Sequence, residues 1–158
     1  MEAVYAKDDQ GAYQTLKINI EKDSETVFNL LSTTEGVQKW FPQLSFEERI
    51  VGGKVTFHMD EQDDVEMEIT AFEDNIAIGY TWSTGAVRFD LYDSGSETVL
   101  ILDEFLPFDF PHIILDFSGW QFQIQSIKSV AETGRSLDQS EYDFNSIKEE
   151  VETKLDLG

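Results

Sequence analysis

"FSGWQFQIQSIKSVAETG", residues 117–134, carries the strongest indication of how this chain folds. Its large apolar residues recur at steps of three and four, the spacing of one face of an α-helix. They are Phe117, Trp120, Ile124, Ile127 and then Val130 or Ala131. Gly134 is suited to end the helix, since glycine adopts the left-handed conformation at little cost. We therefore predict a long helix over 117–132 whose apolar face needs a partner.

The partner is provided by the strands that precede this helix. Residues 65–71 alternate between apolar and polar side chains, which is typical of a half-buried strand. A first strand is expected around Leu16 to Ile20, and six more strands between Phe46 and Phe105, joined by short turns. Gly52-Gly53 predicts a two-residue hairpin, because glycine tolerates positive φ at both turn positions. The order strand, two helices, six antiparallel strands and long helix leaves one curved sheet to pack on that helix.

Two short helices are expected between the first strand and the rest of the sheet. In the second, Val37, Trp40 and Phe41 fall at i, i+3 and i+4 before Pro42 ends it, and Thr34 is the expected cap. A twisted sheet that grips one helix leaves a gap, and these helices lie where it would open. We expect Trp40 and Phe41 to fasten the second helix over one end of the sheet.

Several segments together resemble a known family. They are "LKINIEKDSETVFNLLS" (16–32), "WF" (40–41), "FEERIVGG" (46–53), "YTW" (80–82), "VRFDLYDSGSETVLILDE" (87–104) and "GW" (119–120). The chain is similar to the activator of heat-shock protein 90 ATPase homologue-like family, within the START-type helix-grip (SRPBCC) superfamily. The resemblance covers about residues 14–133. It implies an α+β fold: about seven antiparallel strands wrapped around the C-terminal helix, with a deep apolar cavity between them.

The whole of 1–158 is predicted to be one START-like domain, with 134–158 as a helical extension. Ligand-contacting residues are expected on the inward rows of the strands, on the long helix and at the Trp40 corner. They are Trp40, Phe57, Met67, Ile69, Ile78, Tyr80, Trp82, Phe89, Trp120, Ile124 and Ile127. Such rows either fill a core or line a cavity. Tyr and Trp favour the cavity, because their polar atoms need a hydrogen-bond partner when buried.

The first functional hypothesis is non-enzymatic binding of a small apolar molecule, such as a lipid, isoprenoid or polyphenol. A chaperone-associated or stress-response protein is the alternative, and a cyclase or aromatase-like enzyme is the third. An enzyme would need an acid or base inside the cavity, for which Tyr80 is the candidate. Asp103 and Glu104 point to opposite faces of one strand and are predicted to be surface carboxylates.

Composition excludes several other classes of function. The net charge of -21, with 32 acidic and 11 basic residues, argues against nucleic acid and anionic membranes as partners. The chain has no cysteine and only two histidines, His58 and His112, so neither a metal site nor a cofactor is expected. Residues 1–10 are polar and acidic, and no apolar run could span a bilayer. We therefore expect a cytoplasmic protein without a signal peptide.

"FLPFDFPHIILDF", residues 105–117, is unusually apolar for a connection. Pro107 and Pro111 predict that it is neither a regular helix nor a central strand. Three outcomes are open: burial against its own sheet, a homodimer interface, or a lid over the cavity. Beyond simple burial the homodimer is favoured over the lid, because a lid must move and this stretch has no glycine before Gly119.

Overall fold

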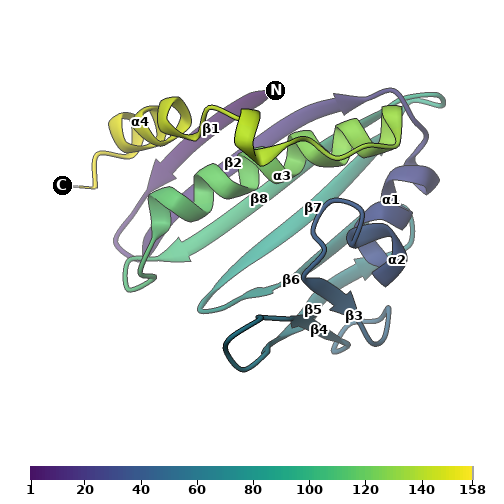
Figure 1. The fold of residues 1–158 in the computed structure, drawn as a ribbon, viewed down its shortest axis with the longest axis horizontal. Helices are drawn as coiled ribbons and strands as arrows, with labels where there is room; N and C mark the ends of the chain where they lie inside the picture. Colours follow the sequence, from purple (N-terminus) through teal and green to yellow (C-terminus); the bar gives the residue numbers. More distant parts are fainter. Residues whose placement is uncertain (158) are drawn as a thin grey trace.

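The computed structural model describes residues 1–157, and its central feature is a curved antiparallel sheet (Figure 1). Within that range the sheet has eight strands, in the order β1-β2-β8-β7-β6-β5-β4-β3. The strands are β1 (Glu2–Lys7), β2 (Gly11–Ile20), β3 (Leu44–Phe46), β4 (Lys54–Phe57), β5 (Val65–Glu73), β6 (Ala77–Trp82), β7 (Gly85–Asp93) and β8 (Thr98–Pro107). The predicted α+β helix-grip architecture is confirmed.

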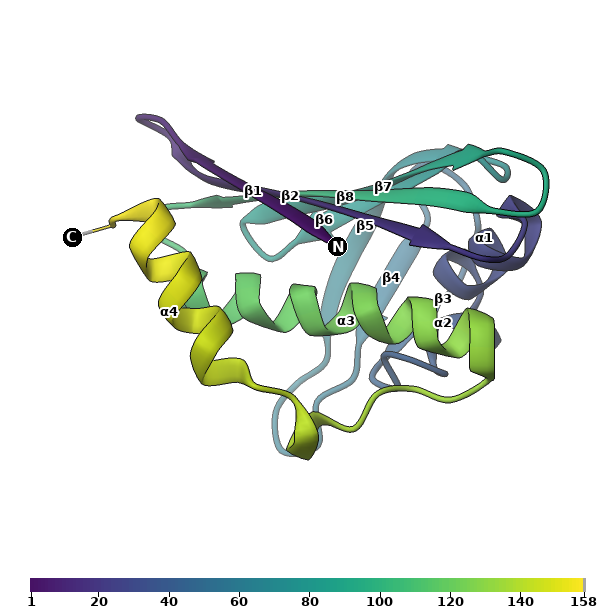
Figure 2. The same ribbon diagram turned by 90° about the horizontal axis from the view of Figure 1, so that it is seen from above.

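The helices form the second layer. They are α1 (Ser24–Ser32), α2 (Thr34–Val37), α3 (Ile113–Thr133) and α4 (Phe144–Leu155), with a short 3-10 turn at Gln139–Glu141. Figure 2 shows α3 running along one face of the sheet, with α1 and α2 near its C-terminal end and α4 near its N-terminal end. No helix among residues 1–157 is both long enough and apolar enough to cross a membrane.

The core lies between the sheet and α3. Alternate residues of β2 and β8 face α3, so Leu16 and Ile20 on β2 and Leu100 on β8 are fully buried. Ile124 and Ile127 of α3 are fully buried in the same cluster. The i, i+3 and i, i+4 stripe recognised in the sequence is therefore the face of the helix that the sheet grips.

The sheet has one strand more than was predicted, because β1 extends it beyond β2. β1 pairs antiparallel with β2, with Glu2 opposite Lys17 and Lys7 opposite Ala12. It is an edge strand, and only Ala3 and Tyr5 are partly buried against the core. Its weak apolar alternation explains why periodicity alone did not reveal it.

The predicted two-residue hairpin at Gly52-Gly53 is wrong. β3 ends at Phe46 and β4 begins at Lys54, so the connection is longer. Gly52 has φ +88°, whereas Gly53 is required for a different reason. A Cβ at Gly53 would lie 2.3 Å from the backbone oxygen of Glu48. The second glycine therefore permits a close approach of two backbones rather than a turn.

The secondary structure predicted for residues 105–117 is also wrong. β8 is a central strand and continues to Pro107, and α3 begins at Ile113 instead of residue 117, so only 108–112 lie outside regular structure. Pro107 is the last residue of its strand and Pro111 precedes the helix. Both prolines therefore stand where a missing amide donor costs little.

The Trp40 corner is packed as expected. Trp40 is 3% exposed, and its Nε1 donates to the Leu30 backbone oxygen at 2.8 Å. Its ring lies against Phe89 and Trp120, with centroids 6.4 and 6.3 Å away. The cap of α2 is Thr33 rather than Thr34, because the Thr33 hydroxyl accepts the Gly36 amide. This corner thus closes one side of the core.

The chain after α3 returns along that helix and ends in α4. The Leu137 amide donates to Ser126 Oγ at 3.2 Å, and Gln125 Nε2 donates to Tyr142 OH at 2.9 Å. Val151 and Leu155 of α4 are buried in the main core. Within the predicted helical extension, the long helix is α4, which begins at Phe144.

Candidate functional site: an aromatic pocket at the start of α3

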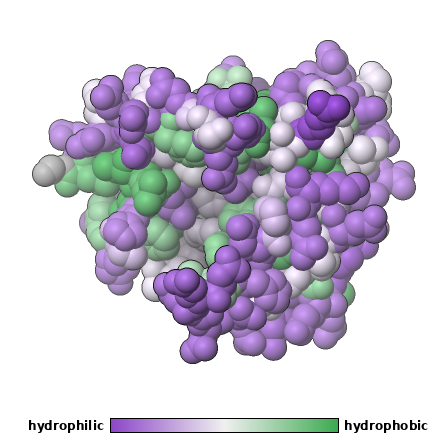
Figure 3. Space-filling model, in the orientation of Figure 1, coloured by the Kyte–Doolittle hydropathy of each residue, from purple (hydrophilic) through white to green (hydrophobic). Residues whose placement is uncertain are grey.

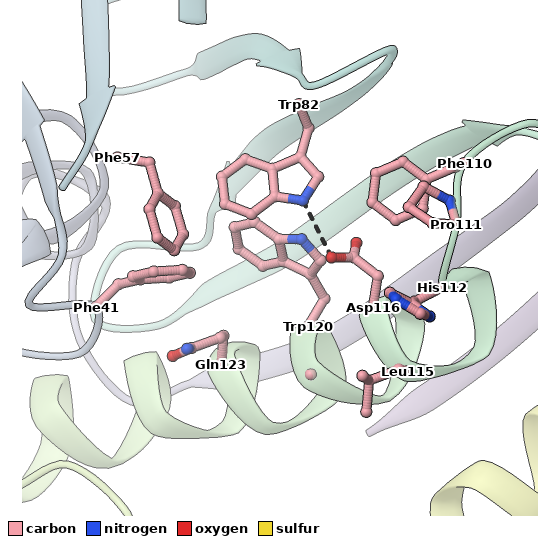
Figure 4. A pocket seen from close by; sticks show the side chains of 11 residues that line it. Phe41, Phe57, Trp82, Phe110, Pro111, His112, Leu115, Asp116, Trp120 and Gln123 are labelled. Carbon is pink, nitrogen blue, oxygen red and sulfur yellow. Dashed lines mark hydrogen bonds between the residues drawn. The ribbon is translucent and has the colours of Figure 1, made fainter. Parts of the chain in front are cut away.

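A cavity of about 330 Å³ opens between the first turns of α3 and the far ends of β4 and β6 (Figure 4). In Figure 3 it is the hollow near the centre of the face. α3 and the loop before it form one wall; the segment after α2, together with β4 and β6, supplies the other. Its lining is Phe41, Phe57, Trp82, Phe110, Pro111, His112, Leu115, Asp116, Gly119, Trp120 and Gln123.

Aromatic rings fix the shape of the pocket. Trp82 ends β6 on its inward side, and its ring meets Trp120 edge to face at a centroid distance of 5.1 Å. Phe41 lies 5.9 Å from Trp82 and 5.6 Å from Phe57, both with near-perpendicular rings. These contacts are of the favourable edge-to-face type, so each ring holds its neighbours in place. The wall is therefore formed before any ligand enters.

Three polar side chains interrupt the apolar lining: Asp116, Gln123 and the exposed His112. Trp82 Nε1 donates to Asp116 Oδ1 at 3.2 Å, which holds the carboxylate beside the two indoles (Figure 4). The other oxygen, Asp116 Oδ2, is buried, and no N–H group or side-chain hydroxyl among residues 1–157 donates to it. Gln123 Oε1 is also buried and has no hydrogen-bond partner among the described residues. The pocket thus combines an apolar body with a few fixed acceptors.

Glu104 lies behind Asp116 and corrects a prediction, because it is not a surface carboxylate. It is 2% exposed, on the inward row of β8 with Leu102 and Leu106. Gln14 Nε2 donates to its Oε1 at 3.2 Å. Burial raises the pKa of Glu104 well above its usual value, and the Asp116 carboxylate within hydrogen-bond reach raises it further. Burial therefore favours the protonated form of Glu104, which is placed to donate to Asp116.

A chain of hydrogen bonds continues from Glu104 toward α4. Gln121 Nε2 donates to Gln14 Oε1 at 2.8 Å and to Tyr5 OH at 2.5 Å. Tyr5 OH donates to Glu150 Oε2 at 2.9 Å. Burial, assisted by the Glu150 carboxylate, raises the pKa of Tyr5 to about 12. β1 and α4 thus cover and satisfy the polar groups between the sheet and α3.

The residues predicted to contact a ligand divide into two groups. Phe57, Trp82 and Trp120 line the pocket. The others are buried in the core cluster: Trp40, Met67, Ile69, Ile78, Tyr80, Phe89, Ile124 and Ile127. Tyr80 is fully buried, and its hydroxyl has no partner in the described part of the chain.

Sequence reasoning missed Asp116 and Gln123 as residues of the pocket, and Glu104 as the buried group behind Asp116. Asp116 and Gln123 are spaced seven residues apart on α3, which places them on one side of the helix, two turns apart. Glu104 lies two residues after Leu102 on the same strand and therefore points to the same inward face, which was a visible signal in the sequence. The prediction gave more weight to the charge of Glu104 and placed it at the surface.

Comparison with known proteins places the fold. No family model matches the chain, and no curated protein matches it. A conserved protein of unknown function from Enterococcus faecalis shares 26% identity over 97% of this chain and 90% of its own, with a TM-score of 0.89. CalU16 from Micromonospora echinospora shares 12% over 96% and 94%, with a TM-score of 0.74.

The Aha1 dimer from Colwellia psychrerythraea is a third similar structure. It shares 17% identity, covers 77% of this chain and 97% of its own, and has a TM-score of 0.65. These likenesses show a shared fold, in which the curved sheet and the long helix position the pocket described above. At these identities the last two comparisons concern the fold alone.

Proposed function

We propose that this protein binds a small, largely apolar molecule in the aromatic pocket at the start of α3, without changing it chemically. The observation that carries this proposal is the open space of about 330 Å³ beside Trp82 and Trp120, at the edge of the buried core cluster. Ligand sites are commonly roughly 300–1,000 Å³, mostly apolar, with a few placed polar groups. Asp116 and Gln123 supply such groups here.

The family resemblance supports the same proposal. We propose membership of the activator of heat-shock protein 90 ATPase homologue-like family on the motifs quoted above, together with the fold shared with the Aha1 dimer structure. Such a helix-grip domain would sequester or carry its ligand between sheet and helix. The pocket is large enough for a compact ring system but would admit only part of a long acyl chain.

Gly119 provides a direct test of ligand binding. It lines the pocket, and a Cβ built there meets no atom within 4 Å, so a larger side chain would enter the cavity. We expect wild-type protein purified from its own host to retain a small molecule in native mass spectrometry, and Gly119→Leu to lose it. Gly119→Ala is the matched control and should keep the ligand. Equal retention by wild type and Gly119→Leu would contradict the proposed site.

A second role, association with another protein chain, is favoured by one observation. Phe108 and Leu115 are 47% and 55% exposed on either side of the short loop before α3. Figure 3 shows an apolar area at the end of the molecule where α3 begins and the C-terminus lies. We propose that these residues contact a second copy of the chain. A chaperone partner is the alternative that the family resemblance implies.

A further inference from the structure

We infer that the pocket selects a cationic ligand: an ammonium group attached to a compact apolar body, with Asp116 as its anionic partner and the indoles of Trp82 and Trp120 around it. This inference rests on the proposed function and names the chemical class of its ligand. It comes from the joint placement of a carboxylate and aromatic rings in one cavity.

The first step is the position of the negative charge. Asp116 lines the pocket and is half-buried, whereas Glu104 behind it is almost completely buried. Taking a charge out of water at Glu104 would be costly. A negative charge is therefore held at lower cost on Asp116, on the pocket side.

The second step is the surrounding surface. The indole ring faces and the phenyl rings of Phe41, Phe57 and Phe110 attract a cation through their π-electrons, and Trp does so most strongly. Among the charged groups of the pocket lining, His112 is the one that could oppose a cation, and it is exposed to solvent. An anionic ligand would meet Asp116 and the field of a chain with net charge -21.

Phenyltrimethylammonium and tert-butylbenzene test the inference, because they share one shape and differ in charge. NMR titration should give both probes measurable affinity for the wild type, with the cation about tenfold tighter. In Asp116→Asn the cation should bind several-fold more weakly than to wild type, because only the attraction of the rings remains, whereas the affinity of tert-butylbenzene should be unchanged. Unchanged binding of the neutral probe also shows that the variant is folded.

Two control variants separate local from general electrostatics. Asp109→Asn removes one exposed carboxylate from the neighbouring loop and should keep the preference for the cation. Glu104→Gln leaves the charge on Asp116 and should also keep it. Equal affinity of both probes for wild type, or a preference as large in Asp116→Asn as in wild type, would overturn the inference while leaving the binding function intact. Failure of both probes to bind would contradict the proposed function as well.

Discussion

The two halves of α3 pack against the same sheet in different ways. In the C-terminal half, Ile124, Ile127 and Val130 enter a continuous apolar core. In the N-terminal half, Asp116 faces the pocket, and Gln121 belongs to a buried chain of hydrogen bonds. A continuous apolar stripe is enough to hold the helix on the sheet at one end. The other end is therefore free to carry polar groups and empty space, which cost stability and permit binding.

The largest effect on stability is expected at Trp40, where the packed core meets the two short helices. Trp40→Ala should lower the free energy of unfolding by about 4 kcal/mol, because it leaves a cavity beside Phe89 and Trp120 and an unpaired Leu30 oxygen. Trp40→Phe, which keeps an aromatic ring, should cost less. Urea denaturation measures both. An unchanged midpoint in Trp40→Ala together with weaker ligand binding would make Trp40 a recognition residue.

The packed half alone is tested by Ile127→Ala. Ile127 is fully buried and does not line the pocket, so its truncation should cost about 3 kcal/mol. The affinity for phenyltrimethylammonium should stay within about twofold of wild type, since distant and independent sites behave additively. A loss of binding as large as that in Asp116→Asn would show that the two halves are coupled.

The polar half is tested by the pH dependence of stability in Glu104→Gln. The pKa of Glu104 in the folded state is raised above the ordinary value of 4.5. As the pH rises through 4.5, the unfolded chain therefore loses this proton while the folded chain still holds it. The contribution of Glu104 to wild-type stability is full below about pH 4.5 and falls as the pH rises toward the folded-state pKa, by up to about 1.4 kcal/mol per pH unit.

Glutamine does not titrate, so the stability of Glu104→Gln relative to wild type should increase between pH 5 and 7.5. Urea titrations across pH 4 to 8 measure the difference between the two curves. Asp103→Asn, on the exposed face of the same strand, controls for the removal of one carboxylate. A constant difference across this range would mean that Glu104 is not held protonated in the fold.

The smallest effect on stability is expected at the exposed apolar area beside the pocket. A Phe108→Ser and Phe110→Ser double variant should change the unfolding midpoint little, because Phe108 is largely exposed and Phe110 only partly buried. It should abolish self-association of the wild type at micromolar concentration in analytical ultracentrifugation. A wild type that sediments as a monomer would remove the homodimer proposal.

The contrast between the two halves also explains what the sequence could predict. Ile124 and Ile127 were predicted to face the sheet, because apolar periodicity is a local property of the chain. Glu104 was predicted to be exposed, since its burial depends on Gln14 from β2 and Asp116 from α3, partners far away in sequence. β1 was missed for a related reason. Its position depends on pairing with β2 and on Tyr5 reaching Gln121 and Glu150.

The three tryptophans allow the division between a packed half and a binding half to be measured in one experiment. Trp82 and Trp120 line the pocket, whereas the Trp40 indole is buried and hydrogen-bonded to Leu30. In a ¹H–¹⁵N NMR titration with phenyltrimethylammonium, we predict that the indole signals of Trp82 and Trp120 shift on binding and that of Trp40 moves far less. A shift largest at Trp40, or no shift at any of the three, would contradict this account of the protein.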